Sequence, residues 1–190
     1  MSSSAPIGTF AEAWPAVERP DLVAAPVAAA LAAWSAAEPV ESVLVVDTDP
    51  DAADTAVFCE TYGVLPEQSA NCVIVAAKRA STTTLAACMV LAGTRADVNG
   101  LVRRHLGARK ASFAPMDTAV SESGMEYGGI TPVGLPAAWP LLVDAAAADA
   151  PWVVVGSGVR RSKLLLPGKV LAALPGAEVL EGLGVPLGQG

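Results

Sequence analysis

Asn71-Cys-Val-Ile-Val-Ala-Ala77 is rich in β-branched residues and predicts a strand. A polar turn, Lys78-Arg-Ala-Ser81, follows it, and Thr82–Leu91 continues as a second β-prone stretch. A connection this short joins antiparallel strands, because parallel neighbours need a crossover of a dozen or more residues. The hairpin, in a chain that also contains helical segments without regular βαβ alternation, favours an α+β fold with a mixed sheet over a doubly wound fold.

Two helices and one strand are expected before the hairpin. Asp21 is expected to cap a helix that runs to about Ala37. Residues 42–46, Ser-Val-Leu-Val-Val, predict a short buried strand. The acidic turn at residues 47–51 is expected to cap a second helix, which ends at Gly63.

Short helices and strands also fill the chain after the hairpin. Helices are expected at residues 97–106, 115–124 and 167–174, and strands at residues 110–113, 140–143, 152–155, 164–166 and 178–180. We find no internal repeat and no linker, so 190 residues predict a single domain with one substantial core.

Charge is distributed unevenly along the chain. The net charge of −7 argues against a dedicated nucleic-acid-binding protein, since phosphate contacts require Lys and Arg. However, residues 78–190 hold eleven of the twelve Lys and Arg residues against eight acidic ones. Either this second part meets a polyanionic ligand or its cations belong to ordinary solvated faces.

Composition also limits location and metal content. No apolar run is long enough to span a bilayer, and the N-terminus lacks a secretory pattern, so a cytoplasmic protein with no membrane contact is expected. Cys59, Cys72 and Cys88 are odd in number and lack metal-binding spacing, which predicts buried reduced thiols. The carboxylates at residues 47–54 lack the glycine and final Glu of an EF-hand loop, so no metal site is expected.

Residues 124–134, Gly-Met-Glu-Tyr-Gly-Gly-Ile-Thr-Pro-Val-Gly, form a segment that we call the glycine loop. Its glycines permit positive φ and close approach of a ligand to the backbone, while Pro132 restricts itself and Thr131. The loop therefore offers backbone N–H and C=O groups to a ligand. The alternative interpretation is a tight connection between two strands.

Conventional side-chain catalysis finds little support. His105, the single histidine, lies beside Arg103 and Arg104 on an expected helix face, and no Gly-x-Ser-x-Gly elbow supplies a nucleophile. Gly156-Ser-Gly158 lacks the third glycine of a dinucleotide fingerprint, so no cofactor is expected. A glycine-rich backbone suits holding a carbonyl or oxyanion, and an activated ester is a suitable substrate.

Gly128-Gly-Ile-Thr-Pro-Val-Gly134 resembles the Gly-Gly-(Ile/Val)-Ser-Pro-(Phe/Leu)-Gly segment of the YbaK/EbsC family. This family is related to the editing domain of bacterial prolyl-tRNA synthetases, and its members hydrolyse mischarged aminoacyl-tRNA. The resemblance extends, in the same order as in the family, over roughly residues 52–182. Its further segments are Tyr62-Gly-Val-Leu-Pro-Glu-Gln68, residues 97–113, Leu141-Leu-Val-Asp144, and Val153-Val-Val-Gly-Ser-Gly158 with Arg160.

The resemblance implies a mixed, partly barrel-like β-sheet with flanking helices, formed by residues 51–183. Residues 1–50 would then be a helical extension that packs on the core, or else a homodimer contact. The implied partner is the acceptor end of a mischarged tRNA, whose own ribose hydroxyl assists attack by water. The implied catalytic residues are Asn71, Thr131 and Asp144, and the implied substrate-binding residues are Gly128, Gly129, Ile130, Pro132, Gly134, Ser157, Gly158 and Arg160.

One position departs from the family pattern. Members have Glu-Gln-x-x-Lys-Thr-Leu where this chain has Glu67-Gln-Ser-Ala-Asn71-Cys-Val, so Asn71 replaces the active-site lysine. An amide donates hydrogen bonds but carries no positive charge. Lys78 lies seven residues further along the strand and should face away, so Arg160 or Lys163 is the better substitute, and Cys72 is expected in the core.

Three functions remain open at this stage. The first is a free-standing aminoacyl-tRNA deacylase. The second is a non-catalytic module that binds aminoacyl-adenosine or a similar ligand after loss of the lysine. The third is a hydrolase of another small activated ester.

Overall fold

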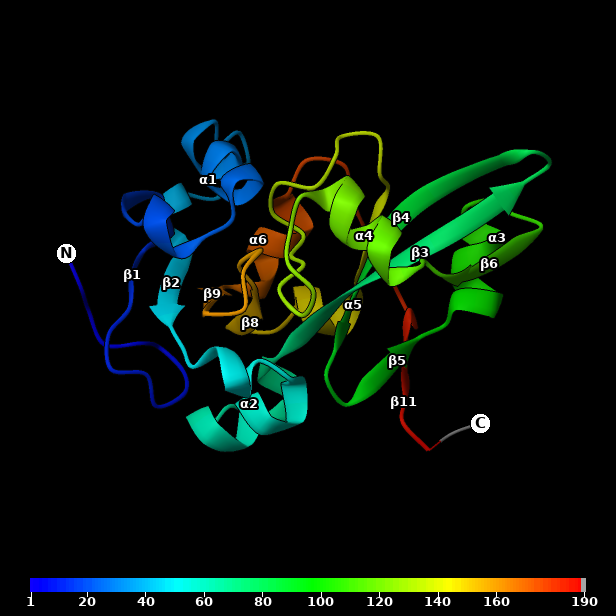
Figure 1. The fold of residues 1–190 in the computed structure, drawn as a ribbon. Coiled ribbons are helices and arrows are strands. Elements are labelled where there is room, and N and C mark those ends of the chain that lie inside the picture. The colour runs from blue at the N-terminus through cyan, green and yellow to red at the C-terminus, as the bar shows by residue number, and fades with distance from the viewer. Residues whose placement is uncertain (189–190) are drawn as a thin grey trace.

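The computed structural model describes residues 1–188 and contains three β-sheets flanked by short helices (Figure 1). The first sheet has four strands in the order β1 (Trp14–Pro15), β2 (Leu44–Asp47), β9 (Ser162–Leu166) and β8 (Val153–Gly156). All of its pairings are antiparallel. Residues 164–166, expected as a central strand, belong to β9, which pairs with β2 on one side and with β8 on the other.

The second sheet has five strands and is mixed. Its order is β10 (Ala177–Leu180), β7 (Leu141–Asp144), β4 (Thr82–Leu91), β3 (Ala70–Arg79) and β6 (Lys110–Phe113). β3 pairs antiparallel with β4 and β6, whereas β7 pairs parallel with β4 and β10. The predicted hairpin and the α+β class with a mixed sheet are therefore confirmed. None of the sheets formed by residues 1–188 closes into a barrel.

Six α-helices accompany the sheets. They are α1 (Ala25–Ala32), α2 (Thr55–Tyr62), α3 (Arg103–His105), α4 (Met116–Ser123), α5 (Ala145–Ala148) and α6 (Gly168–Ala173). A π-helical turn, Val98–Val102, precedes α3, and short 3-10 turns lie at Ala16–Glu18, Pro20–Leu22, Val40–Ser42, Pro50–Ala52 and Pro66–Gln68. No helix within the described residues is both long and apolar enough to cross a membrane.

Strand β4 separates the two largest core clusters. Ala87 and Met89 point into a cluster shared with α1 and the four-stranded sheet, while Cys88 and Val90 point into a cluster under Val98–Val102. This alternation follows from the two-residue period of a strand. The hairpin of β3 and β4 extends away from the four-stranded sheet, with α3 and β6 beside its far end (Figure 1).

The first fifty residues contribute to the same core. Val27 and Leu31 of α1 are buried in the cluster that contains Val45 of β2 and Leu164 of β9. A smaller cluster buries Phe58 of α2 against the other face of β9.

The predicted helix caps have mixed outcomes. Gly63, Gly107 and Gly124 end helices with positive φ, as expected. Asp97 also behaves as predicted, because its carboxylate accepts hydrogen bonds from the backbone N–H groups of Gly100 and Leu101, although the first turn is π-helical.

The prediction that Asp21 caps a helix ending near Ala37 is wrong. Asp21 instead pairs with Arg19 at 2.7 Å, and α1 runs only from Ala25 to Ala32, with Pro26 in its first turn where its fixed φ fits. The acidic turn likewise does not cap the second helix directly: Asp49 caps the 3-10 turn Pro50–Ala52, and α2 begins later.

Several short elements were not expected. They are β1, helix α5, and the two-stranded sheet of β5 (Thr94–Ala96) and β11 (Gly184–Pro186). All are two to four residues long, so local sequence carries little signal for them.

The two aspartates predicted as caps allow a matched comparison. We expect Asp97→Ala to lower the free energy of unfolding by about 1 to 2 kcal/mol, because two N–H groups at the start of a helix lose their acceptor. Asp21→Ala should leave the urea midpoint close to that of the wild type, since the pair with Arg19 is exposed. Equal losses in the two urea titrations would contradict this assignment.

Candidate functional site

A cavity of about 390 Å³ lies between α2, the beginning of β3, the end of β8 and the glycine loop. Apolar side chains such as Phe58, Ile74 and Val154 form much of its wall. The polar side chains that line it are Asp54, Thr55, Ser69, Asn71, Tyr127 and Lys163. Few polar groups in a largely apolar cavity of this size are typical of a small-ligand site.

The glycine loop lies directly against the turn between β8 and β9. The Gly158 N–H donates to the carbonyl oxygen of Gly129 at 2.7 Å. A Cβ on Gly129 would lie 2.8 Å from the Val159 backbone, and a Cβ on Gly156 would lie 2.6 Å from the oxygen of Ile130. Glycine is therefore needed here so that two backbones can touch, as well as for the positive φ of 77° at Gly128.

Arg160 holds the glycine loop in place from outside the cavity. Its backbone N–H donates to the carboxylate of Glu126 at 2.8 Å. Its Nη1 donates to the Tyr127 oxygen at 3.5 Å, and its Nη2 donates to the Pro50 oxygen at 3.2 Å. The guanidinium thus links the loop to the segment before α2 and is absent from the cavity lining.

Lys163 is the cation inside the cavity. It lies on β9, on the face that α2 covers, and is only 7% exposed. Its Nζ lies 3.4 Å from the Ala53 oxygen, 3.5 Å from the Gly128 oxygen and 5.4 Å from the centre of the Phe58 ring. The ammonium therefore lies between α2 and the glycine loop.

The surroundings of Lys163 lower the pKa of its ammonium. Burial is the largest cause and the positive charge of Arg160 is the second, while the carboxylate of Asp54 acts in the opposite direction. The Lys163 ammonium would interact strongly with any negative charge that forms in the cavity, because few other groups in the cavity compete for the ammonium.

Asn71 stands at the beginning of β3 and faces the same cavity. Its Oδ1 accepts a hydrogen bond from the Thr55 hydroxyl of α2 at 2.9 Å. The amide nitrogen is then the group of this side chain that can donate to a ligand. One wall of the cavity thus offers an amide and another offers an ammonium.

Known proteins share the sequence pattern of the segments that form this site. Residues 49–174 match the family model of the aminoacyl-tRNA editing domain. The chain belongs to this family. No curated protein sequence matches the chain significantly.

Solved structures share the fold of this editing domain. A scaffold protein from work on epitope backbone grafting superimposes with a TM-score of 0.69 at 22% identity, over 83% of this chain and 95% of that one. A candidate trans-editing enzyme for prolyl-tRNA synthetase superimposes with a TM-score of 0.69 at 20% identity, over 82% and 93% of the two chains. The predicted family and fold are thus confirmed.

Of the residues predicted for the site, the editing domain brings Asn71, Gly128 and Ile130 together in the cavity lining. Gly129 and Gly158 lie behind them and join the loop to the β8–β9 turn.

Ser157 is a second support of the β8–β9 turn. It is fully buried, and its hydroxyl contacts the Val159 oxygen at 3.1 Å and the Ser162 hydroxyl at 2.7 Å. Ser162 in turn donates to the Leu22 oxygen. These bonds occupy the Ser157 hydroxyl within the fold of the editing domain.

The remaining predicted residues lie outside this lining. Asp144 is buried at the end of β7, where its carboxylate accepts from the Gly184 N–H at 3.1 Å. Thr131 is fully buried, and its hydroxyl finds no partner among the described residues. Pro132 and Gly134 line a separate apolar cavity of about 200 Å³ beside Trp34.

The other reactive side chains of the editing domain are unsuited to nucleophilic attack. Cys72 lines the cavity, but burial raises the pKa of its thiol well above the usual range. Burial also raises the pKa of Cys88 to about 12. His105 is bound to Glu178 at 3.0 Å on the far side of the hairpin.

Sequence reasoning named Lys163 as a substitute cation but did not assign it to the site. The available signal was a charged residue inside Ser162-Lys-Leu-Leu-Leu166, a run that is otherwise suited to a buried strand. Thr55 and the rim residues Phe113, Met116 and Tyr127 were missed, because they come from four separate segments.

Replacing Lys163 with methionine should make the editing domain more stable. We expect Lys163→Met to raise the free energy of unfolding at pH 7 by about 1 kcal/mol or more, since an incompletely paired buried charge gives way to an apolar chain of similar length. Urea titrations of the two proteins at pH 7 measure this difference.

The same titrations at higher pH provide the control. A lysine whose pKa is lower in the folded state binds fewer protons there than in the unfolded state, so its contribution to stability rises with pH up to the unfolded value of about 10.4. The advantage of Lys163→Met should therefore shrink between pH 7 and pH 10. A difference that stays constant or grows would show that the pKa of Lys163 is not lowered.

Proposed function

We propose that this editing domain is a free-standing deacylase that hydrolyses the ester of a mischarged aminoacyl-tRNA in trans. The observation that carries this proposal is the buried ammonium of Lys163, held 3.5 Å from the Gly128 oxygen in a cavity that Asn71 also lines. The family places lysine at the position of Asn71, and here β9 supplies the cation from another wall of the cavity.

The aminoacyl group occupies the cavity and the terminal adenosine lies at its mouth. A cavity of about 390 Å³ accepts a small or medium amino acid. Phe113 and Tyr127, which are 65% and 56% exposed, stand at the rim. Exposed aromatic rings at this point offer stacking surfaces for the adenine base.

Hydrolysis needs a water molecule and a group that stabilises negative charge. Water adds to the ester carbonyl carbon, and the bond from that carbon to the ribose oxygen then breaks. A proton from the water passes to the leaving ribose oxygen through the neighbouring ribose hydroxyl of the substrate. Lys163 and the amide of Asn71 stabilise the oxyanion that forms on the carbonyl oxygen, in a site where apolar walls strengthen the interaction.

The glycine loop positions the ester in this scheme. Its backbone is fixed by Gly158 on one side and by Arg160 on the other. A fixed backbone keeps the carbonyl of the substrate within reach of Lys163 without reorganisation during the reaction. The substrate, aminoacyl-tRNA, is a cytoplasmic molecule, so the proposal also assigns the protein to the cytoplasm.

A panel of mischarged tRNAs tests this function. We expect the wild type to hydrolyse at least one aminoacyl ester well above the buffer rate, and Lys163→Met to reduce kcat by about 100-fold or more, as loss of an oxyanion donor does. Lys169→Met, an exposed lysine paired with Glu38, is the matched control and should keep full activity. Saturable binding without turnover across the panel would instead support the non-catalytic module.

A double variant tests whether a lysine on β3 can replace the lysine on β9. In the Lys163→Met background, Asn71→Lys should restore a substantial part of the lost deacylation rate, because it returns one ammonium to the same cavity. Asn71→Gln in that background is the control without charge and should restore nothing. Single-turnover hydrolysis of the preferred aminoacyl-tRNA is the measurement, and equal rates for the two double variants would refute the exchange.

A further inference from the structure

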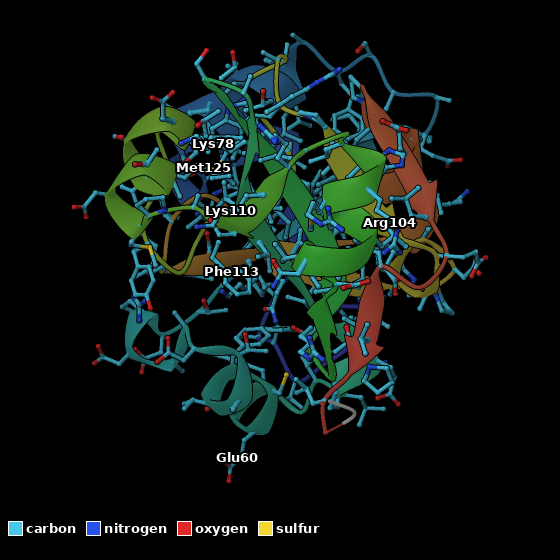
Figure 2. The ribbon with its side chains drawn as sticks, turned by 90° about the vertical axis from the view of Figure 1, so that its right-hand side faces the viewer. Glu60, Lys78, Arg104, Lys110, Phe113 and Met125 are labelled. Atoms are coloured by element: carbon cyan, nitrogen blue, oxygen red, sulfur yellow. The ribbon has the colours of Figure 1, made fainter. Side chains whose placement is uncertain are left out.

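Five exposed cations gather at the far end of the hairpin. They come from the end of β3, from α3, from the turn before β6 and from its first residue, and we call them the basic surface: Lys78, Arg79, Arg104, Arg109 and Lys110. In Figure 2, Lys78, Lys110 and Phe113 lie one below another, and Arg104 lies apart from them, to the right. A protein of net charge −7 thus places five of its twelve Lys and Arg residues at one end of the hairpin.

Within residues 1–188, the cations of the basic surface have no acidic partners. Elsewhere in residues 1–188 basic side chains form ion pairs, as in Arg19 with Asp21, Arg161 with Asp47 and Lys169 with Glu38. Within the same described part of the chain, no member of the basic surface makes an ion pair with a carboxylate. Their charge is therefore available to an external anion.

The backbone holds like charges next to each other. Lys78 and Lys110 are directly opposite in the register of β3 and β6. The Arg109 N–H donates to the Lys78 oxygen at 2.9 Å, and Arg79 reaches towards Gly107 in the turn before β6. Opposed like charges destabilise a sheet unless an anion lies between or over them. A chain of phosphates relieves the repulsion at several cations together.

The basic surface is connected to the mouth of the cavity. β6 runs from Lys110 to Phe113, a distance of about 10 Å at the rise of a strand, and Phe113 forms part of the cavity rim. The other elements at the cavity carry acidic residues, namely Asp117 and Glu122 on α4 and Asp54 and Glu60 beside or on α2. Figure 2 shows Glu60 beyond Phe113, on the side away from Lys78. Of these elements, β6 carries a cation and no carboxylate, so it offers a polyanion a favourable approach to the cavity.

We propose that the basic surface binds the phosphodiester backbone of the tRNA acceptor arm while the 3′ end enters the cavity. This proposal rests on the proposed function for its choice of RNA. The single-stranded 3′ end passes along β6, with Phe113 available for stacking, and the paired stem lies on the hairpin end and α3. The cations contact phosphates, so the surface recognises RNA by charge and position rather than by sequence.

Direct RNA binding tests the proposal without any catalytic step. We expect the double variant Lys78→Gln/Lys110→Gln to weaken binding of uncharged tRNA about tenfold or more at 0.1 M salt. The slope of log K against log[salt] should fall in magnitude by roughly 1.5, as expected for two lost phosphate contacts. Arg161→Gln/Lys169→Gln removes the same charge elsewhere and should change neither quantity appreciably. Equal affinities for the two variants would overturn the proposal.

Hydrolysis of two substrates separates this inference from the proposed function. Lys78→Gln/Lys110→Gln should lower kcat/KM for aminoacyl-tRNA by a factor similar to the loss of binding, and should leave hydrolysis of 3′-O-aminoacyl-adenosine unchanged. If neither substrate is hydrolysed by the wild type, the proposed function fails and the binding experiment still decides the role of the surface. If the variant hydrolyses both substrates more slowly by the same factor, the substitutions affect the cavity itself and the proposal is wrong. Urea titration confirms that each variant is folded.

Discussion

The contact on which the cavity depends is the close approach of two backbones, that of the glycine loop and that of the β8–β9 turn. The Gly158 N–H reaches the Gly129 oxygen at 2.7 Å only because neither Gly129 nor Gly156 carries a side chain. Ser157 and Ser162 stabilise the turn from beneath, and Arg160 ties the loop to Pro50. Each of these groups serves to hold one stretch of main chain against the cavity. In this part of the family motif, glycine is a packing requirement as much as a conformational one.

The proposed exchange of a lysine on β3 for one on β9 has an electrostatic basis. What an oxyanion needs is a positive charge at the right point of a poorly solvated cavity, whatever strand supplies it. Lys163 is buried beneath α2 and forms no ion pair within the described residues, and burial disfavours its charge in the folded protein. A side chain that opposes folding in this way is a strong indication of function, because stability alone would favour an apolar residue at this position.

Local signals in the sequence were sufficient for much of the fold. The hairpin, β6, α4 and the glycine helix ends follow from β-branched runs and turn residues that act within a few positions. Asp21 was misassigned because a nearby Arg19 competes for its carboxylate. Asp144 could not be placed from sequence, since its partner Gly184 lies forty residues away and belongs to a strand of three residues. Lys163 could not be assigned to the site from sequence, because its burial depends on the packing of α2 over its face of β9.

Strand β3 joins the cavity to the basic surface as one continuous segment. Asn71 and Lys78 are seven residues apart on it, about 23 Å at the rise of a strand, and its core-facing side chains are packed from both sides. A continuous strand does not shorten to fit a smaller ligand. The length of a ligand therefore contributes to its recognition as well as its chemistry. A compound that occupies only one end of β3 leaves the other end unused. Simultaneous binding at both ends selects molecules that are long enough to reach both.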